Sequence, residues 1–467
     1  MPHKIFEIDE ILRDIVWYTK HIRETTTVSL ACCCKSFEEP ALSLLWFSKP
    51  FYELAALFPS ILTRVPTEEE WSRFRRYASW IRILSVDRAP GYATQEATIL
   101  LDLIASHFTK QATTVFPNLR NLTWHSEPSS LTFLPSLVSP ILTDFRVHIV
   151  ARWDTKRLPG GYSPLELVIN STISPSNLHS LCLNIPPEAN PSPELKRGVA
   201  DLILRCGSAL TNFEAEFEIP DSAILHLMSL PNLAAWRAVQ PAPMELVSSP
   251  LRPTVPFTQI EHLSLRTTTP LDWLSFISTL AGEKSLPLPV PRTPTFTFGN
   301  LTSFDMDAPS GRACLYSCTF PLTDSDISLL AAALPRLEWV HLGAPCFFNT
   351  CQTTFRSLHT LSTRCPQLQD LYIHINTATL VQDIGSVFEE QTQGTGPGSC
   401  VGRRSCPLNL RCAHCIPLEA NVGVGDLEVV VKGFFAISVT IDVPFTFSDS
   451  NSRLWAKISG GIKALHV

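Results

Sequence analysis

FPNLRNLTW, at residues Phe116–Trp124, contains the pattern from which the fold of this chain can be predicted. From Leu119 onward, apolar residues occupy the first, fourth and sixth positions, and polar residues fill the gaps. Apolar residues at alternate positions are typical of a strand that buries one face. Pro117 cannot continue a helix, so the stretch predicts a turn that leads into a short strand.

The apolar triplet recurs along the chain, with 23 to 41 residues between successive occurrences. Chance alone would give about 40 such triplets at this composition, so the triplet needs independent support. Prolines supply it: residues 117, 231, 335 and 366 are prolines two positions before a triplet, where chance predicts about 0.8. The triplets begin at Ile81, Leu119, Leu142, Leu178, Leu210, Leu233, Ile260, Leu301, Leu337 and Leu368.

Amphipathic stretches with apolar residues at helical spacing precede several of these triplets. Thr323 and Asp326 have the spacing of a capping box, which predicts a helix that starts there and runs to Leu334. Helix, turn and short strand therefore alternate, as in an α/β solenoid whose units bury one face against their neighbours. The stretches are 99–108, 199–206, 224–228, 327–334 and 355–361.

Residues 1–50 follow a different pattern. One apolar stripe at helical spacing consists of Ile8, Ile11, Leu12 and Ile15. A second stretch covers residues 28–34, and a third helix is expected to begin at Pro40, because proline is tolerated in the first turn. The pattern predicts three short helices, which are too small to be stable by themselves.

The composition indicates a folded protein with reduced cysteines. Hydrophobic residues make up 45% of the chain and charged residues 17%, which favours a large core over disorder. The net charge of -6 shows no basic excess, so nucleic acid is not an expected partner. No apolar run has the ~18 residues of a membrane span and no signal peptide is recognised, which predicts a cytoplasmic or nuclear location. Cys32, Cys33 and Cys34 are expected to be small buried side chains.

These patterns divide the chain into predicted segments. A helical motif at 1–50 precedes a helical linker at 51–80 and the repeats at 81–388. Residues 389–405 are rich in glycine, threonine and serine and are expected to form a flexible loop. Residues 406–467 are expected to form further repeats or a strand-rich cap, in which the alternating runs 427–431 and 437–443 form a hairpin or terminal strands.

No catalytic constellation is recognised, so we expect neither an enzyme nor a cofactor. The best metal candidate is the C-x-x-C pair Cys412 and Cys415. No second pair at zinc-binding spacing accompanies it, so reduced thiols beside a loop are the favoured interpretation and no metal is expected. Asp305 and Asp307 could work as an acid/base pair, although alternate positions on an exposed strand explain them better.

A patch rich in basic and aromatic residues covers residues 71–77 and contains Arg73, Arg75 and Arg76. Contact with phosphate is one interpretation. The acids at 68–70 stand at helical spacing from these arginines, so a solvated helix face with internal ion pairs is favoured.

The N-terminal residues resemble an F-box. The family pattern is approximately L-P-x-E-I-L, then an apolar helix, then V-C-K-x-[WF] and L-W. Glu10-Ile11-Leu12, Cys34-Lys35-Ser36-Phe37 and Leu45-Trp46 match it, and Ile8 stands where the family has proline. The chain is most similar to F-box proteins of mushroom-forming (basidiomycete) fungi, in which degenerate leucine-rich repeats often follow the F-box.

The resemblance and the repeats together predict an α/β fold: a short N-terminal three-helix F-box-like motif followed by an irregular leucine-rich-repeat solenoid of helix–strand units. The resemblance implies a substrate-recognition adaptor of an SCF-type cullin ubiquitin ligase. Its motif would bind the Skp adaptor and through it a cullin, and its repeats would bind an unknown target protein. The alternative is a leucine-rich-repeat interaction scaffold with no ubiquitin link. The residues expected at the adaptor contact are Ile8, Ile11, Leu12, Ile15, Val28, Leu30, Phe37, Leu45 and Trp46.

Overall fold

A computed structural model gives the fold as two compact units, Met1–Glu216 and Phe217–Val467, which we call unit 1 and unit 2. The described residues are 9–22, 24–33, 35–59, 61, 63–87, 95–109, 114–126, 128–150, 162–185, 191–239, 259–267, 270–280, 298, 300–307, 322–342, 352–373, 375–376, 379–394, 408–411, 429–432, 439–442 and 458–462.

Unit 1 begins with three helices, α1 (Asp9–Ile22), α2 (Glu24–Cys33) and α3 (Lys35–Leu45), which we call the N-terminal motif. The expectation that the third helix begins at Pro40 is wrong, because α3 begins at Lys35 and contains Pro40. Proline in a helix removes one backbone donor, a loss that a helix tolerates best close to its start. The Ser43 hydroxyl donates a hydrogen bond of 2.9 Å to the Pro40 carbonyl.

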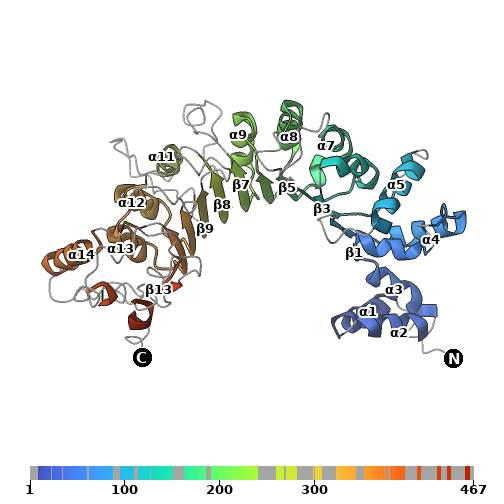
Figure 1. Cartoon of the computed structure of the whole chain (residues 1–467), viewed down its shortest axis with the longest axis horizontal. Coiled ribbons are helices and arrows are strands. Elements are labelled where there is room, and N and C mark those ends of the chain that lie inside the picture. Colours follow the sequence, from blue (N-terminus) through green and yellow to red (C-terminus); the bar gives the residue numbers. More distant parts are fainter. Residues whose placement is uncertain are drawn as a thin grey trace. The chain divides into compact units, whose positions relative to one another are not determined.

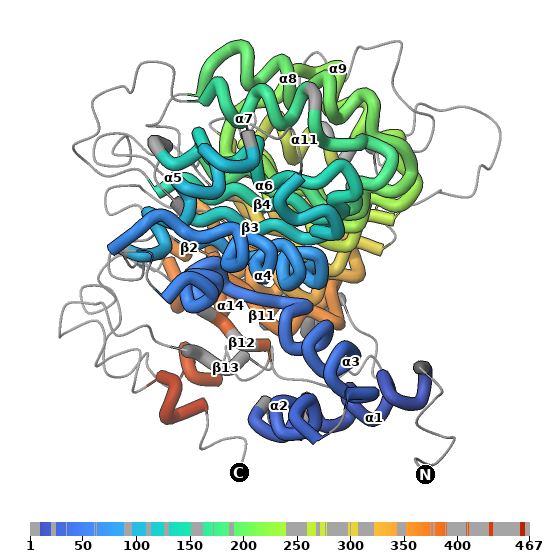
Figure 2. Tube along the Cα trace, turned by 90° about the vertical axis from the view of Figure 1, so that its right-hand side faces the viewer, coloured from blue at the N-terminus to red at the C-terminus, as the bar shows by residue number. Residues whose placement is uncertain are grey.

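The rest of unit 1 consists of parallel strands connected by helices. Each strand pairs in parallel with the next one along the chain, and Figure 2 shows β2, β3 and β4 side by side. The strands are β1 (Ser48–Pro50), β2 (Ile83–Asp87), β3 (Asn121–Ser126), β4 (Asp144–Ile149), β5 (Ser180–Asn184) and β6 (Asn212–Ala215). The helices are η2 (Phe51–Leu57), α4 (Glu68–Ala78), α5 (Gln95–Thr109), η3 (Pro128–Phe133), α6 (Leu134–Leu137), α7 (Ser163–Leu167), η4 (Val168–Thr172), η5 (Pro175–Asn177) and α8 (Pro193–Arg205).

Unit 2 repeats the arrangement. Its strands also pair in parallel in chain order, from β7 through β13, and Figure 1 shows α11 to α14 on one side of these strands. The strands are β7 (Ala235–Val239), β8 (His262–Arg266), β9 (Ser303–Asp307), β10 (Trp339–Leu342), β11 (Asp370–Ile373), β12 (Leu408–Arg411) and β13 (Val439–Asp442). The helices are α9 (Asp221–Ser229), α11 (Pro270–Leu280), α12 (Asp324–Ala333), α13 (Phe355–Arg364) and α14 (Leu380–Gly394).

The apolar triplets form the core of both units. Each triplet ends inside one of the strands β2 to β11, and none of its three side chains is more than 2% exposed. The capping box predicted at Thr323 and Asp326 is confirmed at the start of α12. A mixed α/β fold with parallel strands and N-terminal helices is therefore the observed architecture.

Three expectations differ from the structure. The linker at 51–80 contains η2 and α4, but these helices connect the paired strands β1 and β2 as later helices connect theirs. Residues 389–394 of the expected flexible loop belong to α14, and residues 395–405 lie outside the described residues. The hairpin predicted from the runs 427–431 and 437–443 is wrong, because residues 429–432 are helical and β13 pairs in parallel with β12. The run 437–443 contains a strand, β13, and its parallel pairing with β12 is a feature that period-two alternation alone does not specify.

Among the described helices, none combines the length and the apolar character that crossing a membrane requires.

Candidate functional site

The N-terminal motif has a small core of its own. Leu12 and Val16 of α1 pack with Phe37 and Ala41 of α3, and each of these side chains is buried. Leu12 and Phe37, which were expected at the adaptor contact, both lie inside the motif. The three helices bury these two side chains internally, so no partner is needed to cover them.

The other expected contact residues have different environments. Ile15 and Leu30 are partly buried against the motif core, and Ile11 and Leu45 are also partly buried. Val28 of α2 is 49% exposed, which keeps it as a candidate for contact with a partner. Ile8 lies outside the described residues.

Two aromatic side chains on α1 were missed by sequence reasoning. Trp17 is 51% exposed and Tyr18 is 72% exposed. The side chains of Leu12, Val16 and Thr19 face the inside of the motif. The hydroxyl oxygen of Thr19 lies 3.3 Å from the hydroxyl oxygen of Thr27 in α2. If the buried side of α1 is centred on this inward row and not on the isoleucines, the helical period places both aromatic side chains on the opposite, solvent-facing side. Cys32 and Cys33 at the end of α2 are also exposed, so their expected burial is wrong.

Trp46 joins the motif to the remainder of unit 1. Its ring stacks on Tyr77 of α4 at 4.6 Å between centroids, and the Lys49 ammonium lies 5.9 Å from its centroid. Arg76 of α4 also contacts Glu38 of α3 at 3.3 Å. The structure therefore gives Trp46, expected as an anchor for the adaptor, a partner within its own chain.

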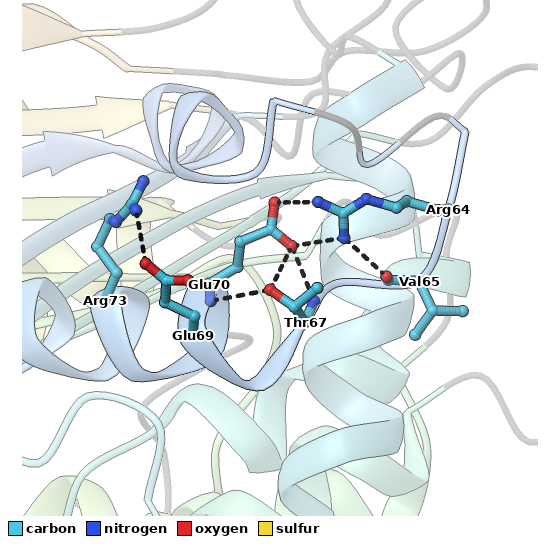
Figure 3. A network of polar contacts seen from close by, with 6 residues as sticks. All are labelled: Arg64, Val65, Thr67, Glu69, Glu70 and Arg73. Carbon is cyan, nitrogen blue, oxygen red and sulfur yellow. Dashed lines mark hydrogen bonds and ion pairs between the residues drawn. The ribbon is translucent and has the colours of Figure 1, made fainter.

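The start of α4 contains the polar network drawn in Figure 3. Thr67 is the N-cap and accepts from the Glu70 backbone, while the Glu70 carboxylate accepts from the Thr67 backbone at 2.8 Å. The Arg64 guanidinium donates to both Glu70 oxygens, at 2.8 and 2.9 Å. The hydrogen bonds from Arg64, followed by the Thr67 backbone, lower the pKa of Glu70 to about 2.

Arg73 and Arg75 of α4 pair with the acids at 68–70, as the ion-pair interpretation predicts, whereas Arg76 pairs with Glu38 of α3. Arg73 lies 3.7 Å from Glu69 (Figure 3), and Arg75 pairs with Glu68. Both pairs lie on the exposed side of α4, where such contacts contribute only ~0.2–1 kcal/mol each. The interpretation of residues 71–77 as a solvated helix face is therefore favoured by the geometry.

The side chains that alternate with the buried triplets form a polar face on the strands of each unit. In unit 1 the His125 and His148 rings lie 4.4 Å apart, and the Asn184 amide nitrogen is 2.9 Å from His148 Nδ1. Cys182 donates from its thiol to Glu214 Oε2 at 3.1 Å. Burial, followed by the nearby His125, lowers the pKa of His148.

In unit 2 the polar face brings together Ser264 of β8, Asp305 of β9 and His341 of β10. The Ser264 hydroxyl donates to one Asp305 oxygen at 2.7 Å, and His341 Nδ1 lies 2.6 Å from the other. Burial by itself raises the pKa of Asp305, but the hydrogen bonds from His341 and Ser264 outweigh it, so the pKa lies below its usual value.

This group does not have the geometry of a catalytic triad. In a triad the imidazole stands between the serine and the carboxylate and takes the serine proton. Here Asp305 stands between Ser264 and His341. An ionised carboxylate only accepts, so His341 donates from Nδ1, and Asp305 fixes the orientation of the ring.

Metal binding has no support in the part of the chain that the structure describes, which contains no group of three or more ligand side chains suited to an ion. The candidate pair Cys412 and Cys415 lies outside the described residues. No protein-family model matches the chain, and no curated protein matches it.

Proposed function

We propose that this chain is a substrate-recognition adaptor of an SCF-type cullin ubiquitin ligase. In this proposal the N-terminal motif binds the Skp adaptor and acts as an F-box. The remaining parallel strands and helices form a leucine-rich-repeat solenoid that binds a target protein. The chain is then a binding protein and not an enzyme.

The solenoid part of the proposal is supported by the alternation of elements within each unit. Strands β2 to β11 each carry one buried triplet, neighbouring strands of one unit pair in parallel, and helices connect several of them. Stacking of similar units, each burying one face, is the construction principle of repeat proteins. Their exposed strand face is a common place for binding a partner.

The observation that carries the proposal is the exposed apolar surface of a motif whose own core is already formed. Leu12 and Phe37 fill that core, while Trp17, Tyr18 and Val28 remain about half or more exposed. Large aromatic side chains are enriched among the residues that dominate binding energy at protein interfaces. Exposed side chains of this kind on α1 and α2 suit contact with a partner helix.

Co-purification with the Skp adaptor tests the proposal. The full chain is co-expressed with the adaptor as wild type, as Tyr18→Asp, and as Tyr52→Asp. Tyr52 is the matched control, because it is 48% exposed on η2, outside the motif. We expect the wild type and Tyr52→Asp to retain the adaptor and Tyr18→Asp to lose it, since a charge placed in an interface must be desolvated.

The second candidate is an interaction scaffold that has the same repeats and no ubiquitin link. Ile8 favours it, because the F-box pattern has proline at that position. Failure of the wild type to retain the adaptor, with the chain folded by circular dichroism, would favour the scaffold.

A further inference from the structure

One position recurs just before the strands of both units: the residue that directly follows the first apolar residue of a triplet. Within each unit, its backbone carbonyl accepts hydrogen bonds from two consecutive N–H groups of the following repeat. In unit 1 the Arg82 carbonyl accepts from Arg120 and Asn121 at 2.8 and 2.9 Å. In unit 2 the Glu261 carbonyl accepts from Thr302 and the next residue, at 3.0 Å each. Because neighbouring strands are ~4.8 Å apart, the residues at this position form a row along one rim of each unit.

The charge of this row differs between the units. The row of unit 1 has two arginines and one histidine and no acid, whereas the row of unit 2 has two glutamates and no basic residue. The same backbone bonds form in both units, so the fold does not require basic residues at this position. The row of unit 1, which we call the basic rim, consists of Arg82, Arg120, Thr143, His179 and Thr211. The row of unit 2 consists of Ala234, Glu261, Thr302, Glu338 and Gln369.

The turns that lead into the strands of unit 1 bring no acid to the basic rim. These turns contain no aspartate and no glutamate. They consist of residues 79–82, 114–120, 138–143, 173–179 and 206–211. The surface around the rim therefore has few negative charges of its own.

Asp144 is the one acid among the first residues of β2 to β6. Its carboxylate accepts from the hydroxyl of Thr143 at 2.8 Å. Among the residues that the structure describes, neither Arg82 nor Arg120 forms an ion pair. Two arginines against one aspartate leave an excess of positive charge at this end of β2, β3 and β4.

The guanidinium of Arg82 is held in place at the rim. Its Nη1 donates to the carbonyls of Ser79 and Asn118, at 3.1 and 3.4 Å. Burial, followed by the positive charge of Arg120, lowers the pKa of Arg82. Arg82 is partly exposed, and Arg120 and His179 are exposed. Two like charges that act on each other at an exposed rim are stabilised when an anion binds between them.

Carboxylates match the planar donor geometry of guanidinium groups. We infer that the basic rim binds an acidic segment of the target protein, with aspartate or glutamate side chains against Arg82 and Arg120. A polynucleotide fits less well, because two arginines and a histidine contact few phosphates and the chain has a net charge of -6. This inference rests on the proposed function, since it names the chemistry of the target that the repeats bind.

The test measures fluorescence anisotropy of a labelled heptapeptide of alternating glycine and glutamate, titrated with the full chain at low salt. A lysine version of the peptide and a labelled single-stranded oligonucleotide are compared. The variants are Arg120→Gln and Arg120→Glu, since no side-chain bond within the described residues depends on Arg120. The same two changes at Arg197 are the matched control, because Arg197 is an exposed arginine of unit 1 that lies on α8 and outside the rim.

We expect the glutamate peptide to bind more tightly than the oligonucleotide and the lysine peptide not to bind. Arg120→Gln should weaken binding about fivefold and Arg120→Glu should weaken it further, whereas the changes at Arg197 should leave it unchanged. Absence of binding by the wild type, tighter binding of the oligonucleotide, or equal weakening by the Arg197 variants would overturn the inference. Adaptor capture is measured on the same preparations. Absence of peptide binding with adaptor capture intact refutes only the basic rim, and the reverse refutes only the proposed function.

Discussion

Leu12 and Val28 are two apolar residues of the N-terminal motif with opposite environments. Leu12 is 2% exposed and Val28 is 49% exposed. We predict that Leu12→Ala lowers the free energy of unfolding of the motif by ~2–5 kcal/mol, because it leaves a cavity among Val16, Phe37 and Ala41. Val28→Ala should change it by less than ~0.5 kcal/mol. Hydrogen exchange of peptides from α1 to α3 measures both, and equal exchange in the two variants would contradict the placement of Leu12.

Glu70 supplies a prediction about pH. Its pKa is lowered to about 2, chiefly by the hydrogen bonds from Arg64, whereas its ordinary value is 4.5. Because the pKa in the folded state is lower than the ordinary value, the ionised carboxylate stabilises the folded protein when the pH is above 4.5. This stabilisation is lost as the pH falls from 4.5 toward 2. We predict that Glu70→Gln lowers the urea midpoint at pH 6 and that its difference from the wild type shrinks between pH 4.5 and pH 3.

Glu69→Gln is the control for this experiment. Glu69 is the exposed neighbour of Glu70, and its side chain is 87% exposed in a 3.7 Å pair with Arg73. It should show little effect at either pH, because exposed ion pairs are weak. A difference between Glu70→Gln and the wild type that stays constant with pH would exclude the ion pair as its source.

At the residue scale, the sequence predicts burial best where one period dominates. In the triplet that begins at Leu119, Leu122 and Trp124 alternate with polar residues, so their burial follows from strand geometry. In α1 the apolar residues cover more than one side of the helix, and the spacing permits several inward rows. Packing against α3 selects the row that contains Leu12 and Val16, which the sequence of α1 alone does not specify.

At the element scale, neighbouring helices are linked through their N-termini. Asp324, the first residue of α12, accepts hydrogen bonds from the backbone and hydroxyl of Thr354, the N-cap of α13, at 2.7 and 2.6 Å. It also accepts from Ser357. In unit 1, Glu166 of α7 accepts from Ser192, the N-cap of α8, in the same way. An acid of one helix thus stabilises the start of the next.

Removing this link should loosen α13. We predict that Asp324→Ala destabilises α13 by ~1–2 kcal/mol, because it removes three hydrogen bonds to a charged acceptor. Hydrogen exchange of peptides from residues 355–364 measures the change. Glu338→Ala is the control, since Glu338 is an exposed acid between α12 and β10. Similar exchange in both variants would mean that Asp324 does not hold the helix start.

The elements themselves were predictable to different degrees. The strands β2 to β11 followed from the triplets, and α12 from its capping box. The strand β1, at Ser48–Pro50, has no triplet and forms through pairing with β2, which no local pattern indicates. Residues 429–432 belong to a run that was expected to be a strand but are helical, because a short apolar run fits either structure.

At the scale of the whole chain, the N-terminal motif and the polar face of unit 2 differ in how far they could be predicted. The N-terminal motif is contiguous in sequence, so its position followed from residue order. On the polar face of unit 2, strand register brings Asp305 beside His341, and these two residues are 36 positions apart in the sequence. The sequence gives the spacing of the triplets but not which polar side chains stand opposite one another, so this contact was not predictable.

Isothermal titration of the purified Skp adaptor into the full chain tests the central claim, that the N-terminal motif is an adaptor-binding module separate from the strand face. We predict binding of one adaptor per chain, at least ~10-fold weaker binding by Tyr18→Asp, and unchanged binding by Asp370→Asn. Absence of binding by the wild type, or the same affinity in Tyr18→Asp, would contradict the account.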